Sequence, residues 1–170
     1  KFSWFNSAEN IKRLRNFKKA DYDSFLNNLN KPLKSGRFVY SNLGMALLGN
    51  ILAEHLETSY EDAVKKYILK PLGMNDTHIS TDCYQLDRLV KGHDSKCRPV
   101  ANFKWESMAP AGQWCSTSKD MMIYLKAHLG YSGEQWELLL GETTQQAFDE
   151  TKFKHVGLAW MMFDNKKMGK

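Results

Sequence analysis

The longest apolar pattern in the chain begins directly after the polar triplet Tyr40, Ser41 and Asn42. Over residues 43–56 the apolar side chains recur at helical spacing, in two stripes. One stripe holds Leu43, Leu47 and Ile51, and the other holds Met45, Leu48, Leu52 and Leu56. Two stripes predict a helix that is buried on most sides, with a polar last turn. The triplet would then stand on a rigid base, where a functional site is readily built.

Capping residues and apolar spacing predict further helices. A short helix is expected to begin at Asp21 and to end before Pro32. Ser59 with Asp62, and Thr117 with Asp120, have the spacing of a capping box. The first box predicts a helix that ends before Pro71, and the second predicts a helix that continues to Gly130. Helical segments are also expected at residues 8–17, 136–140 and 144–148.

Strand signals are few and lie in the second half of the chain. Apolar side chains alternate over residues 156–163, which predicts one strand there. Residues 74–114 are rich in turn formers, so a long loop is expected, with short strands near 89–90 and 100–103. A loop of this length is unusual in a compact domain unless it is functional. The pattern as a whole predicts a helix-rich α+β fold with a small piece of sheet near the C-terminal end.

Composition restricts the class of protein. The 170 residues, 42% hydrophobic and 12% aromatic, suffice for one ordinary domain with a real core and exclude a disordered chain. The sequence has no apolar run of 18 residues and, in its first residues, no apolar stretch typical of a signal peptide. The net charge of +5 includes one basic cluster, at residues 12–19. We interpret this cluster as a solvated helix face and expect no nucleic-acid partner.

The cysteines and histidines show no metal-binding pattern. Cys83, Cys97 and Cys115 form no CxxC pair and have no zinc spacing. Cys83 and Cys97 can form a disulfide in an oxidising compartment, or all three can be free thiols, and the sequence leaves both alternatives open. The five histidines form no HxH or HxxxH pair, and the chain has no glycine-rich phosphate loop. We therefore expect no metal and no cofactor.

Four blocks of the chain resemble blocks of one family, in that family's order. The family is the serine beta-lactamase and penicillin-binding-protein superfamily, in its branch of class C beta-lactamases and D-alanyl-D-alanine carboxypeptidases or esterases. No single block is specific, but together they cover about residues 21–163. The blocks are Tyr40-Ser41-Asn42 within residues 33–49, the PLGM segment of residues 70–77, Pro110-Ala111-Gly112 with Ser116, Thr117 and Asp120, and Gly157-Leu158-Ala159-Trp160.

The resemblance implies roles for two side chains. In the family a Tyr-x-Asn motif supplies a phenol that relays protons and an amide that holds the substrate carbonyl. This implies that Tyr40 is a catalytic residue and that Asn42 binds substrate. A plainer interpretation also exists, in which Tyr40 is an aromatic residue at a strand end and Asn42 is the N-cap of the helix.

The family's two other motifs have only doubtful matches. The nucleophile is expected in a Ser-x-x-Lys motif before Tyr40, and residues 1–39 contain none. Ser116 to Lys119 matches literally, but it follows Tyr40, and helix capping accounts for its hydroxyls. His155-Val156-Gly157 matches the third motif, His-x-Gly on an edge strand, but it overlaps the fourth block, which precedes that strand in the family.

The resulting hypothesis is that residues 1–170 are a single partial domain. They would form the helical subdomain of the beta-lactamase/transpeptidase-like fold, without the Ser-x-x-Lys part and the last strands. A phenol titrates near 10, so its use as a base near neutrality needs a positive potential worth about 4 kcal/mol. The family's lysine supplies much of this potential, so the 170 residues alone are expected to be inactive.

The resemblance also implies the setting of the full protein. It would hydrolyse beta-lactams, D-Ala-D-Ala peptides or esters through an acyl-enzyme, with a small molecule or a peptidoglycan peptide as its substrate. It would be periplasmic, secreted or membrane-anchored facing outward, although no membrane segment is evident in this chain. The alternative is a non-catalytic binding module that retains the helical scaffold. The sequence does not indicate the oligomeric state.

Overall fold

A computed structural model describes residues 18–28, 38–79, 88–100, 106–145, 148–151 and 154–163. The helix expected at residues 8–17 and Cys83 lie outside these ranges, as does most of the basic cluster. The chain divides into two compact units. The first unit comprises Lys1–Pro32, Ser41–Lys65 and His78–Cys115, and the second comprises Leu33–Tyr40, Lys66–Thr77 and Ser116–Lys170.

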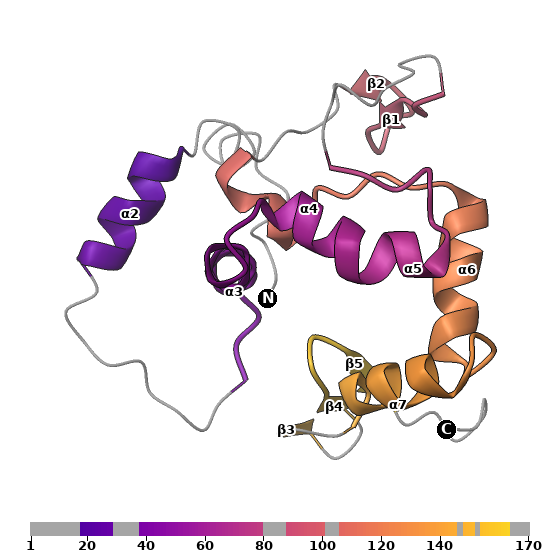
Figure 1. Cartoon of the computed structure of the whole chain (residues 1–170). Coiled ribbons are helices and arrows are strands. Elements are labelled where there is room, and N and C mark those ends of the chain that lie inside the picture. The colour runs from indigo at the N-terminus through magenta and orange to yellow at the C-terminus, as the bar shows by residue number, and fades with distance from the viewer. Residues whose placement is uncertain are drawn as a thin grey trace. The chain divides into compact units, whose positions relative to one another are not determined.

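The first unit is built around the helix that follows the triplet. This helix, α3 (Asn42–His55), packs against η3, a 3-10 helix (Glu106–Ala111), and α2 (Lys19–Asn27) contacts η3 as well (Figure 1). Tyr22, Ala46 and Met108, one from each element, form the buried cluster at their junction. The predicted helices at residues 21 and 43 are thereby confirmed, with small shifts of their ends.

The burial predicted for α3 is wrong. The buried residues of the helix are the small ones, Ala46, Gly49 and Ala53, which lie on one face. The larger side chains Leu48, Ile51 and Leu52 are each about half exposed, at 50%, 51% and 48%. Small residues let η3 approach the helix closely, and the second apolar stripe is left largely uncovered. Apolar spacing thus identified the helix, but it did not show which face has a partner.

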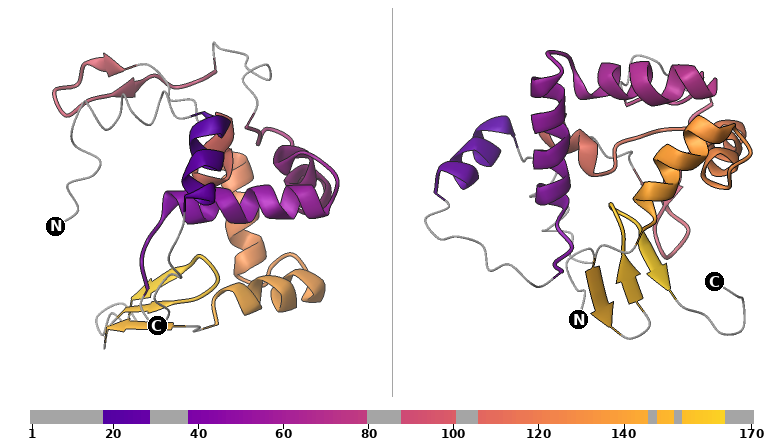
Figure 2. Two further views of the ribbon diagram at one scale, coloured as in Figure 1. Left: turned by 90° about the vertical axis from the view of Figure 1, so that its left-hand side faces the viewer. Right: turned by 60° about the horizontal axis from the view of Figure 1, so that its bottom comes forward.

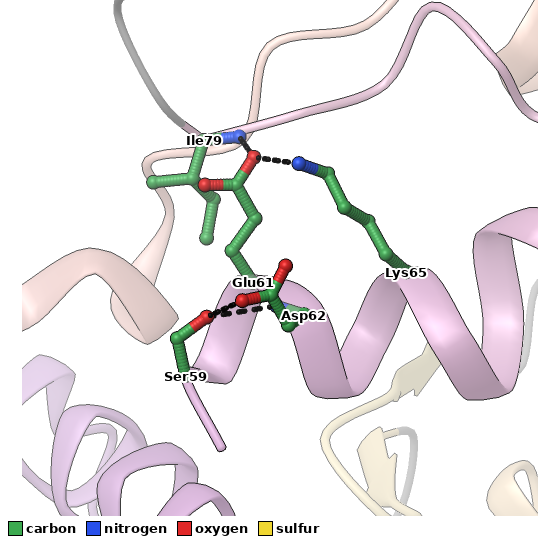
Figure 3. A network of polar contacts seen from close by, with 5 residues as sticks. All are labelled: Ser59, Glu61, Asp62, Lys65 and Ile79. Atoms are coloured by element: carbon green, nitrogen blue, oxygen red, sulfur yellow. Dashed lines mark hydrogen bonds and ion pairs between the residues drawn. The ribbon is translucent and has the colours of Figure 1, made fainter.

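The next helix, α4 (Tyr60–Val64), begins at the cap that the sequence predicted. The Ser59 hydroxyl accepts the Asp62 backbone N–H at 3.0 Å and donates to the Asp62 carboxylate at 2.7 Å. The neighbouring Glu61 carboxylate accepts the Ile79 N–H at 3.0 Å and pairs with Lys65 at 2.9 Å (Figure 3). Glu61 therefore ties the segment at Ile79 to α4, 18 residues away in the chain.

Helical structure continues through Pro71, although the sequence predicted that it would end before this residue. α4 is followed by η1, a π-helix (Lys65–Leu69), and by α5 (Lys70–Leu72), which ends at Gly73 in the left-handed region, with φ of 77°. Proline lies in the first turn of α5, where its missing N–H does least harm. The wider π turn before it changes the hydrogen-bond register that proline would otherwise break.

The segment 74–114 contains more structure than expected, at different positions. β1 (Gly92–His93) and β2 (Pro99–Val100) form an antiparallel pair, with Gly92 opposite Val100. The strand expected near residues 89–90 is therefore wrong, since Val90 is 85% exposed outside any strand. The one expected at 100–103 is confirmed at Val100, and residues 101–103 lie outside the described residues. Cys97, in the turn of this hairpin, is a free thiol, as is Cys115.

Besides α5, the second unit contains α6 (Ser118–His128), α7 (Glu134–Thr143) and a sheet. Both predicted helices are present, as α6 and α7, and they contact each other. Three antiparallel strands follow in the order β3-β4-β5 (Figure 2). Their bounds are Phe148–Thr151, Lys154–Val156 and Met161–Phe163. The helical turn expected at 144–148 is wrong at Phe148, which begins β3. The helix-rich α+β class with a small C-terminal sheet is confirmed.

The single strand predicted for residues 156–163 is wrong, because a tight turn interrupts it. The Gly157 N–H donates to the Trp160 carbonyl at 2.9 Å, and Ala159 adopts a positive φ of 64°. A Cβ on Gly157 would lie 2.5 Å from the Thr143 carbonyl oxygen, so only glycine fits against the end of α7. The turn thus joins β4 to β5 and packs against the end of α7.

Candidate active-site residues and family membership

Ser41, and not Asn42, is the N-cap of α3. Its hydroxyl accepts the Gly44 N–H at 3.0 Å, and its backbone is extended, with φ of −143° and ψ of 110°. Asn42 is the first helical residue and is partly exposed. The plainer interpretation, in which Asn42 serves as the cap, is therefore wrong. With the cap supplied by Ser41, the Asn42 amide is not required to begin the helix.

Tyr40 lies in an extended stretch just before the cap. Its side chain is 48% exposed, so the hydroxyl is not sealed in apolar packing. Among the residues that the structure describes, none bonds to this hydroxyl. Tyr40 belongs to the second unit and Asn42 to the first. The roles assigned to the two side chains remain predictions.

Ser116 does not have the geometry of a Ser-x-x-Lys nucleophile. It precedes Thr117, the extended N-cap of α6, so Ser116 and Lys119 are not separated by one helical turn. Its hydroxyl lies 2.7 Å from the Thr77 hydroxyl, which donates to the Asp120 carboxylate at 2.7 Å. Because Thr77 has a single hydroxyl hydrogen, Ser116 must be the donor in their contact. A structural role accounts for this serine.

Asp120 is the acceptor on which this network converges. It is 2% exposed, and its carboxylate also accepts the Asp76 backbone N–H at 2.8 Å. The predicted capping box at Thr117 is thus only half formed: the threonine hydroxyl accepts the Asp120 N–H at 3.2 Å, but the carboxylate binds residues 76 and 77. Sequence reasoning missed this role because the spacing to Thr117 suggested a local partner.

The His155-Val156-Gly157 match to a third motif is not supported. That motif requires an edge strand, whereas β4 lies between β3 and β5 in the described sheet. His155 is paired with Asp149 on one side and Met162 on the other. Gly157 is required by the close approach of the Thr143 carbonyl. These residues serve the hairpin and its contact with α7.

The described ranges contain no candidate metal site and no candidate membrane-spanning helix. In this part of the chain, no three His, Cys, Asp or Glu side chains are grouped closely enough to hold a metal ion. Within the same residues, no helix has the length and apolar character needed to cross a membrane.

The chain is similar to proteins that carry beta-lactamase names. A family model described as Beta-lactamase matches residues 17–169. "Beta-lactamase-like protein 2" of Dictyostelium discoideum is 37% identical over 124 residues, which cover 69% of this chain and 22% of that protein. "Beta-lactamase" of Psychrobacter immobilis is 26% identical over 164 residues, covering 92% and 38%. The chain thus spans between about a fifth and two fifths of the length of these curated relatives.

The chain also resembles solved structures that carry beta-lactamase names. The class C beta lactamase from Rhodobacter sphaeroides superposes with a TM-score of 0.70 at 26% identity, covering 84% of this chain and 41% of that one. A Beta-Lactamase/D-Alanine Carboxypeptidase from Pseudomonas syringae gives a TM-score of 0.72 at 20% identity, covering 85% and 41%, and shares the fold. On the strength of the family match over most of its length, the chain belongs to the beta-lactamase family.

Proposed function

We propose that these 170 residues contribute one part of the acyl-transfer site of a serine hydrolase. In this proposal Tyr40 relays protons and Asn42 holds the substrate carbonyl or amide. The nucleophilic serine and its lysine come from a segment outside these residues. The observation that supports this most strongly is the exposed Tyr40 phenol, which precedes a capped helix within the matched family region.

The same proposal makes the chain a partial domain without activity of its own. A phenol becomes an effective base only where positive charge lowers its proton affinity. No described residue bonds to the Tyr40 hydroxyl, and the one literal Ser-x-x-Lys match has its serine committed to Thr77. A phenol and an amide without a nucleophile cannot form an acyl-enzyme.

The substrate classes we propose are beta-lactams, D-Ala-D-Ala peptides and esters. They are supported by the family match and by the names of its structural neighbours, which include a class C beta lactamase and a D-alanine carboxypeptidase. We also propose that the whole protein acts outside the cytoplasm, where peptidoglycan peptides are found. Acyl transfer to a serine, as proposed, calls for no metal or cofactor.

The purified chain is expected to show no burst and no turnover with nitrocefin or p-nitrophenyl acetate above the buffer rate. The reason is the missing nucleophile, and the measurement is absorbance in a stopped-flow instrument. A cooperative thermal transition by circular dichroism, measured on the same sample, would show that the chain is folded. Burst hydrolysis that disappears in Ser116→Ala would contradict the proposal and assign the nucleophile to Ser116.

A second candidate function is a binding module that uses the scaffold without the chemistry. It is favoured by large apolar side chains that are about half exposed on α6, namely Met121, Met122 and Leu125. The gene sequence upstream of Lys1 distinguishes the hydrolase from the binding module. An in-frame Ser-x-x-Lys upstream favours the hydrolase, whereas a start codon immediately before Lys1 favours the module.

A further inference from the structure

A partly buried histidine joins the end of α6 to the β4–β5 turn in the second unit. The His128 ring lies edge-on to Tyr124, one turn earlier on its own helix, at 4.5 Å between centroids and 72° between planes. Trp160, the last residue of the turn, contacts the same ring at 4.8 Å and 67°. The imidazole therefore contacts two aromatic rings, one from the helix and one from the turn.

Both nitrogens of this imidazole are buried, and neither has a hydrogen-bond partner among the described residues. A neutral imidazole leaves one donor and one acceptor unpaired, whereas an imidazolium leaves two charged donors unpaired. Burial without an acceptor penalises the charged form more strongly. This desolvation lowers the pKa of His128 below its usual value of 6.5.

Two effects oppose this penalty. His128 is the last residue of α6, where the helix dipole favours a positive charge, and a cation beside an aromatic face is attracted to it. The pKa of His128 is nevertheless lowered, and the cause is desolvation by burial.

No described ionisable group near the ring stabilises its protonated form by a hydrogen bond. Tyr124 is the titratable neighbour on α6, and the turn 157–160 carries no ionisable side chain. The adjoining strand carries Lys154 and His155, and α7 carries Glu134, Glu137 and Glu142. Glu137 lies beside Gly130, two residues beyond His128, but no side chain that the structure describes accepts a hydrogen bond from the imidazole.

We propose that His128 is a pH-sensitive clamp, which holds the β4–β5 turn against α6 while neutral and releases the turn when the ring takes up a proton. The clamp acts together with two backbone bonds of the turn. The Gly157 N–H donates to the Trp160 carbonyl, and the Leu158 N–H donates to the Thr143 carbonyl at the end of α7, both at 2.9 Å. Acid therefore loosens the turn from both α6 and α7.

The pH dependence has a definite sign. Below about pH 6.5 the unfolded chain binds a proton that native His128 resists, so stability is full above this pH and falls as the pH is lowered. We expect the Tm of the chain to fall between pH 7.5 and pH 5.0, and His128→Phe to remove about 2–4 °C of that fall. The control is His55→Phe, since His55 is an exposed residue at the last position of α3. It should leave the fall unchanged.

Two measurements on the unmodified chain test the clamp without relying on a variant. The NMR titration of the His128 ring should have its midpoint below 6.5. Hydrogen exchange, corrected for the intrinsic rate, should show that the Gly157 and Leu158 amides lose at least tenfold in protection from pH 7.5 to 5.0. A midpoint at or above 6.5, or unchanged protection of both amides, would overturn the proposal. So would an undiminished fall in Tm in His128→Phe.

Discussion

Asp120→Ala is expected to lower the free energy of unfolding by roughly 3 kcal/mol, the largest loss that we expect from a single substitution. The substitution removes a carboxylate that is 2% exposed. It leaves the Asp76 N–H and the Thr77 hydroxyl without their acceptor, and an unpaired buried donor costs about 1–3 kcal/mol. Urea unfolding monitored by circular dichroism measures this loss directly.

Asp62 is the matched control for this prediction. Like Asp120 it is the third residue of a helix whose cap hydroxyl accepts its N–H, but its side chain is exposed. Asp62→Ala should cost less than about 1 kcal/mol, because among the described residues its carboxylate binds only the Ser59 hydroxyl, at the surface. Equal losses in the two variants would show that the contact with residues 76 and 77 contributes nothing beyond a local cap.

The second large effect is expected at Gly49, where η3 meets α3. A Cβ at this position would lie 2.3 Å from the Pro110 Cβ and 2.5 Å from its Cγ. Proline is rigid and cannot swing aside, so Gly49→Ala should force the two helices apart. We expect a net loss of about 1–3 kcal/mol in urea unfolding, although alanine has the higher helix propensity.

Gly141→Ala is the control that separates the clash expected in Gly49→Ala from the effect of helix propensity. Gly141 is also a helical glycine, in α7, but a Cβ there meets nothing within 4 Å. Gly141→Ala should raise the free energy of unfolding by up to about 1 kcal/mol, through propensity alone. If Gly49→Ala proves as stabilising as Gly141→Ala, the close packing of η3 on α3 is incorrect.

The contact of Gly49 with Pro110 and the bonds of Asp120 to residues 76 and 77 both join blocks on which the family resemblance is based. The Tyr-x-Asn block contacts Pro110 through Gly49, and the PLGM block is bonded through Asp76 and Thr77 to Asp120. The fourth block, at Gly157, forms the turn against the end of α7. Much of what identifies the family in this sequence therefore holds the scaffold together, whereas for Tyr40 and Asn42 we propose chemical roles.

Local signals in the sequence were sufficient to predict most helices. Ser59 and Thr117 cap their helices as expected, because a cap depends on residues within one turn. The turn at 157–160 was missed because its residues continue the alternation of the flanking strands. The left-handed residue there is Ala159, which gives no glycine signal. Pro71 wrongly predicted a helix end because a π turn leaves no mark in the sequence.

Long-range contacts account for the remaining differences between the structure predicted from the sequence and the observed one. Apolar spacing cannot show that α3 buries its alanines and leaves Leu48 half exposed, since this depends on where η3 packs. Spacing also could not show that the Asp120 carboxylate turns away from its own cap toward a residue 44 positions earlier. For the site, the residues predicted a polar triplet at a helix start, whereas the roles of Tyr40 and Asn42 came from the resemblance alone.

The central claim is that Tyr40 serves a serine lying outside these 170 residues. The most direct test is covalent labelling, by a fluorescent penicillin, of the longest polypeptide that contains the chain in one reading frame. We predict that mass spectrometry will locate the label on a serine of a Ser-x-x-Lys motif upstream of Lys1, and that Tyr40→Phe will slow labelling by about 10²-fold or more. A label on Ser116, no label at all, or a rate unchanged by Tyr40→Phe would contradict the claim.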